Sequence, residues 1–347
     1  MWRPHALVAV LALAALTPAP AGAASVAVVE HSVDDSSTCS RAPGACDFWI
    51  VEFTAAAGER NRIVLSGGHD GITIRDRGAE IEAGAHCAAS GPHEVRCVAP
   101  KEISHAVVAA GDQGDVVESI MPLHARIAGG AGNDLLVGGA DVEKLYAGPG
   151  RDRLFGGRGN DFLYDGRDGG AVEPDVMDGG YGHDFLSYER RTRRVQVNLS
   201  DPGFASGQAG EGDRLRGIDV VYAGRGNDVL IGSARDDHMS GGPGNDRMRG
   251  GAGDDDLYGD GGADKLFGGN GADTLEAGRG DDAVVGGCGR DGVYGAEGDD
   301  RLYAADGERD EILGDLGMDI AWVDAGRDRV GQVERLRRGA SSTRCAP

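Results

Sequence analysis

The sequence lacks any long apolar run after its first 23 residues. A helix that crosses a bilayer needs roughly 18 or more consecutive apolar residues, and the rest of the chain contains no such run. We also find no lipid-attachment cysteine after that segment and no sorting-type C-terminus. The sequence therefore predicts a protein without a membrane span.

Familiar catalytic motifs are absent as well. His93 and Glu94 are followed by Cys97 where the zinc-protease motif H-E-x-x-H requires its second histidine. The G-x-S-x-G elbow and the G-x-x-x-x-G-K-[S/T] phosphate loop do not occur. The many G-x-G strings lack the strand, helix and following acidic residue of a dinucleotide site. We therefore predict no catalytic residue and no organic cofactor, although paired carboxylates on a β-helix keep a carbohydrate-active enzyme as an alternative.

Basic residues are fewer than acidic residues. The chain has 57 acidic and 35 basic residues, which gives a net charge of -22, and such a chain has no general attraction to nucleic acid. Two groups of arginines are local exceptions, and each is either a solvated turn or tail or a site for a polyanion. The groups are Arg190, Arg191, Arg193 and Arg194, and Arg335, Arg337, Arg338 and Arg344.

Glycine is abundant instead, with 61 residues, and much of it belongs to a nine-residue repeat. Twelve copies run from residue 223 to residue 331 with a single inserted residue, and copies such as 241–249 and 250–258 read G-G-x-G-x-D-x-U-x, where U is a large apolar residue. All twelve copies have aspartate at the sixth position. These aspartates are Asp228, Asp237, Asp246, Asp255, Asp264, Asp273, Asp282, Asp291, Asp300, Asp310, Asp319 and Asp328.

The repeat predicts a turn followed by a short strand. Gly, Asn and Asp tolerate the backbone angles of tight turns, and the apolar residue at position eight fits a short strand. Strands of successive units stack about 4.8 Å apart, so two repeats make one coil of a flattened solenoid and the turns alternate between its two edges. Aspartates two repeats apart then form two rows of carboxylates, which repel one another unless a cation neutralises them.

The energetics of one repeat favour a bound metal. Ordering nine residues costs on the order of 1 kcal/mol or more each, whereas one buried apolar side chain returns roughly 1.5 to 3 kcal/mol and each ladder hydrogen bond about 1 kcal/mol. Oxygen ligands without His or Cys fit calcium better than zinc or copper. We therefore predict several Ca2+ ions, held by the twelve aspartates and by carbonyls of the turn glycines, with folding coupled to binding. The alternative is that Gly and Asp serve only as turn formers.

A less regular array of the same kind occupies residues 129–187. It places aspartates in the ligand position, with Glu143 where a further aspartate would stand, and we expect fewer or weaker calcium sites there. A turn at residues 111–115 resembles a degenerate repeat, and its calcium role is open. The candidate ligands of this first array are Asp134, Asp152, Asp161, Asp175 and Asp184.

The remaining segments predict β structure around the arrays. Residues 24–128 have few aromatics and short β-type runs at 48–54, 62–65, 71–75 and 103–109, which favour a small β-rich cap or a small β-sandwich. Residues 188–222 interrupt the repeats as a β excursion with a strand at 195–199. The second array spans residues 223–331, and the tail at 332–347 is expected to cover the open edge of the solenoid.

The first 23 residues predict a cleaved leader. Arg3 precedes an apolar run and Ala21-Gly-Ala23 resembles a signal-peptidase site, so we expect a secreted, extracellular protein. Six cysteines in an exported chain favour disulfides, and fifteen pairings are possible. Proximity favours Cys39–Cys46 and Cys87–Cys97, which leaves Cys288–Cys345; an intermolecular bridge is the alternative for the last pair.

Together these patterns resemble the exported haemolysin-type proteins with RTX nonapeptide repeats, which are common in high-GC actinobacteria. The resemblance is carried by both arrays, by Tyr188-x-x-Arg191-Thr192 and by Gly210-Glu-Gly-Asp213. It implies an all-β fold, a parallel β-roll or β-helix solenoid with a small N-terminal cap, that folds on binding extracellular Ca2+. The N-terminal leader differs from the C-terminal export signal of many RTX toxins. We expect a non-enzymatic calcium-binding protein; an adhesin or matrix protein with an unidentified surface partner is a further alternative.

Overall fold

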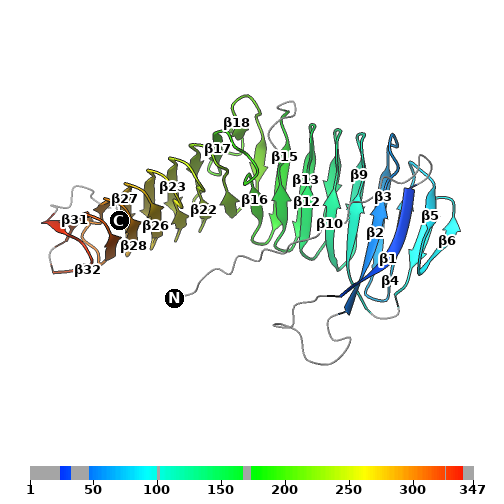
Figure 1. The fold of residues 1–347 in the computed structure, drawn as a ribbon, viewed down its shortest axis with the longest axis horizontal. Coiled ribbons are helices and arrows are strands. Elements are labelled where there is room, and N and C mark those ends of the chain that lie inside the picture. The colour runs from blue at the N-terminus through cyan, green and yellow to red at the C-terminus, as the bar shows by residue number, and fades with distance from the viewer. Residues whose placement is uncertain (1–23, 33–46, 100–101, 167–172, 325, 339–347) are drawn as a thin grey trace.

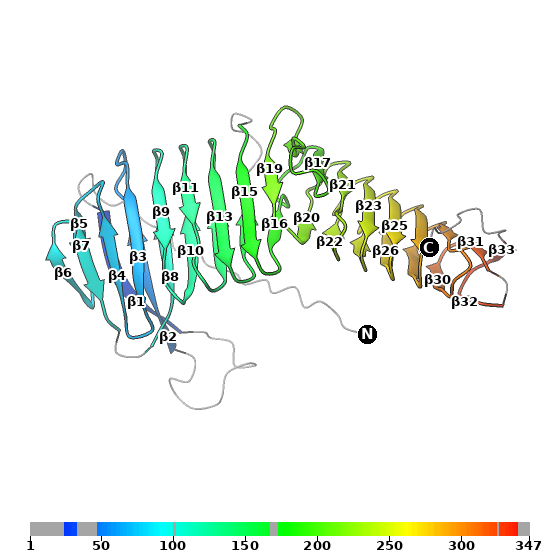
Figure 2. The ribbon, with the colours of Figure 1, turned by 180° about the vertical axis from the view of Figure 1, so that it is seen from behind.

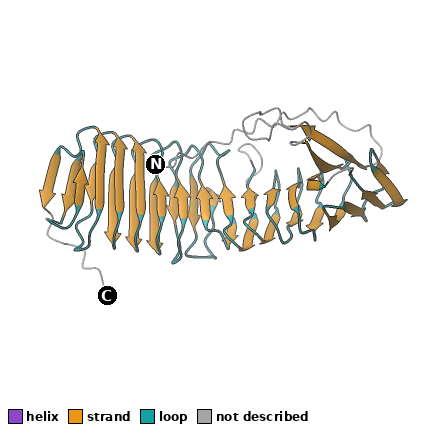
Figure 3. Cartoon of the chain, turned by 90° about the horizontal axis from the view of Figure 1, so that it is seen from below, coloured by secondary structure: helices purple, strands orange, loops and turns teal. Residues whose placement is uncertain are grey.

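The protein forms one elongated solenoid in the computed structural model (Figure 1). The structure describes residues 24–32, 47–99, 102–166, 173–324 and 326–338. These residues form strands and turns without a helix, as the colouring of Figure 3 shows, so the described part contains no helix able to span a membrane. The fold class predicted from the sequence, an all-β parallel solenoid, is confirmed.

A 15-stranded sheet, the long sheet, runs the full length of the solenoid. Its strands follow one another along the axis, and most of them pair in parallel. In spatial order they are β32 (Arg329–Gly331), β30 (Glu311–Leu316), β28 (Gly292–Glu297), β26 (Thr274–Arg279), β24 (Asp256–Tyr258), β22 (His238–Ser240), β20 (Val220–Tyr222), β16 (Phe185–Ser187), β14 (Phe162–Tyr164), β12 (Glu143–Tyr146), β10 (His124–Ala128), β8 (Ile103–Ala109), β2 (Asp47–Thr54), β1 (Ala24–Ser32) and β5 (Ile81–Ala83).

Two nine-stranded sheets form the other wall, and Figure 2 shows them in succession along the axis. The N-terminal sheet comprises β19 (Arg214–Arg216), β15 (Val176–Tyr181), β13 (Arg153–Arg158), β11 (Leu135–Val137), β9 (Val116–Ser119), β3 (Arg62–Gly68), β4 (Gly71–Asp76), β7 (Glu94–Cys97) and β6 (Cys87–Gly91). The C-terminal sheet comprises β18 (Gly207–Gln208), β17 (Val195–Asn198), β21 (Val229–Ile231), β23 (Arg247–Ala252), β25 (Lys265–Asn270), β27 (Ala283–Cys288), β29 (Arg301–Tyr303), β31 (Ile320–Val323) and β33 (Arg335–Arg338).

One coil contains two repeats, because paired strands lie 18 residues apart in the regular array. Met248 of β23 is opposite Leu266 of β25, and Leu257 of β24 is opposite Leu275 of β26. The side chain at position eight of each repeat points inward, and these four side chains are fully buried. The core is therefore a narrow apolar column between the two walls.

The N-terminal end differs because several of its strands are antiparallel. β1 pairs with β2, and β3, β4, β7 and β6 form an antiparallel group at the end of the solenoid. The strands expected at 48–54, 62–65, 71–75 and 103–109 are confirmed as β2, β3, β4 and β8. The predicted Cys87–Cys97 disulfide is also present.

The other predicted disulfides involve residues outside the described parts of the chain. Cys39, Cys46 and Cys345 lie there, as do the predicted leader and most of the tail beyond Arg338. Cys288 is disulfide-bonded. The Cys288–Cys345 pairing stays a prediction.

The segment between the arrays remains part of the solenoid. The strand expected at 195–199 is confirmed as β17, which pairs in parallel with β21. β19 and β20 continue the N-terminal sheet and the long sheet. At the far end β33 adds to β31, so the chain after residue 332 supplies the last strand of the C-terminal sheet.

The turns stack so closely that some glycines admit no side chain. Gly262 has φ of +139°, and a Cβ atom there would lie 1.5 Å from the carbonyl oxygen of Gly244 in the previous coil. Its neighbour Gly261 faces open space. We expect Gly262→Ala to lower the free energy of unfolding by about 2 kcal/mol or more and Gly261→Ala to lower it by less than about 1 kcal/mol. Urea unfolding in calcium measures both, and equal losses would contradict this packing.

Candidate metal centre

The acidic side chains of the repeats form one row on each edge of the solenoid. Each aspartate lies immediately before a strand, and Glu143 begins β12. The long-sheet row contains Glu143, Asp161, Asp184, Asp219, Asp237, Asp255, Asp273, Asp291, Asp310 and Asp328. The opposite row, before strands of the other two sheets, contains Asp115, Asp134, Asp152, Asp175, Asp213, Asp228, Asp246, Asp264, Asp282, Asp300 and Asp319.

In most of these residues one carboxylate oxygen accepts a hydrogen bond from a backbone N–H of the preceding coil. The backbone N–H of Asp246 donates to Oδ1 of Asp264 at 2.7 Å, and the N–H of Asp264 donates to Oδ1 of Asp282 at 2.6 Å. On the long-sheet row the N–H of Asp255 donates to Oδ1 of Asp273 at 2.9 Å. The same bond recurs in the first array, where the N–H of Asp134 donates to Oδ1 of Asp152. Within each array the rows are therefore hydrogen-bonded ladders as well as rows of charge, and the ladders are interrupted at the junction, where Asp213 and Asp219 donate their N–H groups to backbone carbonyl oxygens.

The second carboxylate oxygen of most members is buried and accepts no hydrogen bond from the described residues. A buried anionic oxygen without a donor or a cation is strongly unfavourable. The atoms concerned are Glu143 Oε1, Asp237 Oδ1 and the Oδ2 atoms of Asp115, Asp134, Asp152, Asp161, Asp184, Asp246, Asp255, Asp264, Asp273, Asp282, Asp291, Asp300, Asp310 and Asp319.

Backbone carbonyl oxygens lie beside these free oxygens. A Cβ atom placed on Gly268, the first residue of a repeat, would lie 2.3 Å from Asp273 Oδ2 and 2.3 Å from the carbonyl oxygen of Gly286. At Gly250 the same position is 2.2 Å from Asp255 Oδ2 and 2.7 Å from the carbonyl oxygen of Gly268. Because glycine has no side chain, a carboxylate oxygen of one coil and a carbonyl oxygen of the next coil both lie close to this position. Such an all-oxygen donor set, partly anionic, fits Ca2+.

Burial makes the charged form of these carboxylates unfavourable without a cation. Desolvation, with smaller contributions from neighbouring carboxylates, raises the pKa of Asp255 and Asp264 to about 7. Desolvation is also the main cause at Glu143 and Asp175, where the pKa rises to about 8. The rows are therefore built to hold either protons or metal ions.

These pKa values predict opposite pH dependences with and without calcium. A carboxyl group whose folded pKa is raised stabilises the metal-free fold at low pH, and that contribution is lost as pH rises through about 6 to 8. Calcium needs the deprotonated form. We expect calcium-free protein to unfold at a higher urea concentration at about pH 5 than at about pH 8, and the calcium concentration at half-saturation to be higher at about pH 5. A calcium-free protein that is no more resistant to urea at about pH 5 than at about pH 8, or a half-saturating calcium concentration that is no higher at about pH 5, would contradict the prediction.

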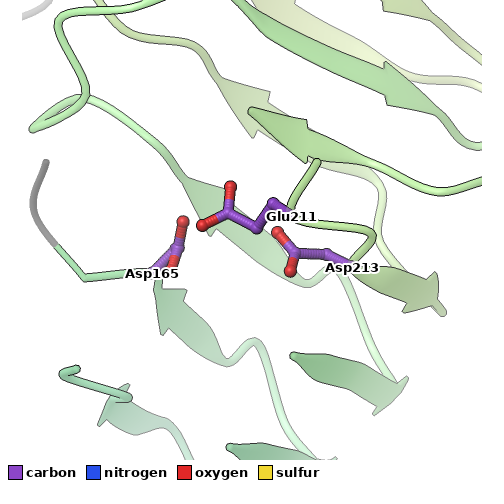
Figure 4. Close-up of side chains that lie close together, drawn as sticks. All are labelled: Asp165, Glu211 and Asp213. Carbon is purple, nitrogen blue, oxygen red and sulfur yellow. The ribbon is translucent and has the colours of Figure 1, made fainter. Parts of the chain in front are cut away.

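The junction between the arrays holds a buried acidic cluster, shown in Figure 4. Carboxylate oxygens of Asp165, Glu211 and Asp213 lie within 4.8 Å of one another, and all three side chains are buried. The guanidinium of Arg191, also buried, donates to Asp165 Oδ2 at 2.9 Å through Nε and to Glu211 Oε1 at 2.6 Å. Tyr188 donates its hydroxyl to Asp213 Oδ2 at 2.9 Å. An arginine thus neutralises two carboxylates beside Asp213 of the opposite row, where the nonapeptides stop.

Replacing Arg191 is expected to destabilise the protein at every calcium concentration. Removing one partner of a buried ion pair costs about 3 to 5 kcal/mol, and Arg191→Gln would leave three neighbouring carboxylates without their cation. Arg190 is exposed, so Arg190→Gln is the matched control with the same charge change. Thermal unfolding with and without calcium measures the effect. If calcium fully restores the stability of Arg191→Gln, the arginine is not an independent cation of the junction.

The structure brings all seventeen sequence-predicted ligands into the two rows. It also places Glu143 in the long-sheet row, where its backbone N–H donates to Asp161 Oδ1 at 2.8 Å. Sequence reasoning left Asp115 open and did not assign Asp213 and Asp219. All three precede a solenoid strand, and this position relative to an apolar strand is the signal that would have revealed them.

These features define a parallel β-roll whose turns present rows of buried carboxylates. A family model for the RTX calcium-binding nonapeptide repeat (4 copies) matches residues 126–152, 146–168, 215–248, 231–266, 258–293 and 267–302. The chain therefore contains RTX calcium-binding nonapeptide repeats between residues 126 and 302, as the sequence resemblance implies. No curated protein matches the chain.

Proposed function

We propose that the protein is an exported, non-enzymatic calcium-binding β-roll that folds and stiffens when it meets extracellular Ca2+. In this proposal residues 1–23 are a cleaved leader, 24–128 cap the solenoid, and 129–187 and 223–331 are calcium-binding arrays. Residues 188–222 join the arrays, and 332–347 close the end. The presence of RTX calcium-binding repeats supports the metal, and the buried rows support its coupling to folding.

The observation that carries this proposal is the series of buried carboxylate oxygens without hydrogen-bond donors. Asp255, Asp264 and their equivalents in both rows would hold Ca2+, together with carbonyl oxygens of first-position glycines such as Gly268 and Gly286. Bound Ca2+ supplies positive charge that neutralises carboxylates of successive coils. The chain's own hydrogen bonds between Asp N–H and Asp Oδ1 set the spacing of the coils and hold the second oxygens in place.

Counting bound ions tests this function. Isothermal titration calorimetry of the metal-free full chain with CaCl2 is expected to show several bound ions, released protons and little response to MgCl2, because Mg2+ retains its water shell more strongly. Atomic absorption after exhaustive dialysis gives an independent count. A chain that binds no calcium at extracellular concentrations would refute the proposal.

A further inference from the structure

The outward face of the C-terminal sheet is basic in a protein that is acidic overall. From β23 to β31 each strand presents two outward positions that flank an inward core residue, and on β33 Arg335 and Arg337 flank Leu336, which is 55% exposed. Six of these twelve positions hold Arg or Lys. In chain order the outward residues are Arg247, Arg249, Lys265, Phe267, Ala283, Val285, Arg301, Tyr303, Ile320, Trp322, Arg335 and Arg337.

No Asp or Glu stands among these outward positions, and the six cations are exposed. None of them forms an ion pair with another described residue; the described ion pairs lie elsewhere. The same coils present Asp256, Glu276 and Glu311 on the outer face of the long sheet, where Arg329 pairs with Glu311 at 3.0 Å. The two faces of the second array are therefore of opposite charge, and only one has unneutralised cations.

Apolar and aromatic side chains alternate with the cations on the basic face. Lys265 and Phe267 stand together on β25, and Arg301 and Tyr303 stand together on β29. β27 lies between them with the smaller Ala283 and Val285 outward. The cation and ring pair thus occurs twice, on strands that stand two apart and therefore about 10 Å from each other along the axis.

A stacked aromatic pair extends this surface toward the C-terminal end. The rings of Tyr303 and Trp322 lie 4.2 Å apart at an angle of 9°. Phe267 is 42% exposed, whereas Tyr303 and Trp322 are half-buried and present part of their rings. The face therefore offers flat apolar surfaces beside fixed positive charges.

We propose that this basic face binds an acidic polysaccharide, carboxylated or sulfated, lying along the solenoid axis. Such a chain carries anionic groups on pyranose rings whose C–H faces are apolar, so one sugar unit meets a cation and an aromatic ring together. In a 1,4-linked chain the same groups recur on alternate sugars, which fits two cation and ring pairs that stand two strands apart. The strands of the C-terminal sheet follow one another along the axis (Figure 1), which suits an extended polymer.

The residues favour a polysaccharide over an anionic bilayer or a nucleic acid. Interfacial membrane binding needs several protruding apolar side chains, and the described strands of this sheet from β23 to β33 offer only two exposed large hydrophobic residues, Phe267 and Leu336. Binding of single-stranded nucleic acid uses successive aromatic platforms for successive bases, whereas Ala283 and Val285 separate Phe267 from the Tyr303–Trp322 pair, whose rings stack on each other.

Calcium is expected to strengthen this binding without bridging it. The rows of carboxylates occupy the edges of the same coils, and their charge repels a polyanion until Ca2+ neutralises it. The arginines and the lysine, rather than the metal, supply the contacts. Reversing the charge of the basic face therefore tests the contacts of its cations separately from the effect of bound Ca2+.

The test uses size-defined oligosaccharides with the full chain in calcium. Fluorescence polarisation measures binding of labelled galacturonate and chondroitin sulfate hexamers, with a neutral cello-oligosaccharide as a ligand control. The variant Arg247→Glu/Lys265→Glu/Arg301→Glu is compared with Arg126→Glu/Lys144→Glu/Arg329→Glu, which makes the same charge change on the long sheet. Far-UV circular dichroism checks that each variant folds at the same calcium concentration.

We expect at least one acidic hexamer to bind in a salt-dependent manner and the C-terminal-sheet variant to lose about tenfold or more of the affinity, while the long-sheet variant changes little. Equal losses in both variants, or tighter binding of vesicles with anionic lipid or of single-stranded DNA, would overturn the proposal. If the triple variant fails to fold, Phe267→Ala and Arg301→Gln are measured singly; unchanged affinity in both would overturn it. None of these outcomes changes the number of calcium ions bound, so a failure of the polysaccharide proposal can be distinguished from a failure of the calcium-binding proposal.

Discussion

Replacing Asp255 by asparagine is expected to remove about 3 kcal/mol from the stability of the calcium-loaded protein, in line with the loss of one member of a buried charge pair. The introduced side chain would keep an oxygen for the hydrogen bond from the Asp237 N–H. Its amide nitrogen, however, would replace the free Oδ2 or face the shared space beside Gly250, where a cation needs an oxygen. The midpoint of the calcium titration is expected to rise about tenfold.

The adjacent residue provides the matched control. Asp254 is exposed, and its Oδ1 accepts a hydrogen bond from the N–H of Ala272 at 2.7 Å. Asn245 makes the equivalent bond to the N–H of Ala263, so Asp254→Asn preserves the local structure and removes the same charge. Urea unfolding and calcium titration of both variants decide the question. Similar behaviour of the two variants would show that general charge, rather than the buried rows, controls calcium binding.

Removing calcium is expected to unfold the second array and to leave the N-terminal end folded. One site occupied at about 100 times its dissociation constant adds about 2.7 kcal/mol to stability, and the second array has many candidate sites with one buried apolar side chain per repeat. The N-terminal end instead contains the antiparallel group and the Cys87–Cys97 disulfide, with Ile63, Leu65 and Ile74 fully buried.

Hydrogen exchange followed by mass spectrometry measures this difference along the chain. In chelator, amides of residues 223–331 are expected to exchange rapidly, whereas those of β3, β4 and β7 stay protected. Restoring calcium, but not magnesium, is expected to return protection to the array in one cooperative step. Uniform protection of both regions in chelator would contradict the coupling of folding to metal binding.

The sequence predicts those parts of the fold that follow from the nine-residue repeat. A nine-residue repeat with an apolar residue at position eight fixes the strand, the 18-residue coil and the inward direction of Met248, Leu257 and their equivalents. The same period places the sixth-position aspartates on alternate edges. Local chemistry and simple geometry were sufficient here because each coil contacts chiefly its neighbours.

The parts that the sequence did not predict depend on irregular segments. Arg191 reaches Asp165 across 26 residues and Glu211 across 20 residues, and no period relates these positions. At the same junction Arg235 forms an ion pair with Asp219 at 3.1 Å. The arginines read from the sequence as a solvated turn or a polyanion site thus include one buried cation, Arg191. Arg335 and Arg337, which the sequence places in a tail or a polyanion site, belong to the basic face; its other four cations lie on β23, β25 and β29 of the repeat array, and the sequence analysis did not group them.

The most direct test of the central claim is a crystal structure of the protein grown in calcium, with anomalous scattering used to locate the ions. We expect anomalous peaks along both edges, bonded to the second oxygens of residues such as Asp255 and Asp264 and to turn carbonyl oxygens. Peaks absent from both rows in a fully formed solenoid, with those oxygens bonded only to water, would show that the aspartates are turn formers and that calcium is not what holds the coils together.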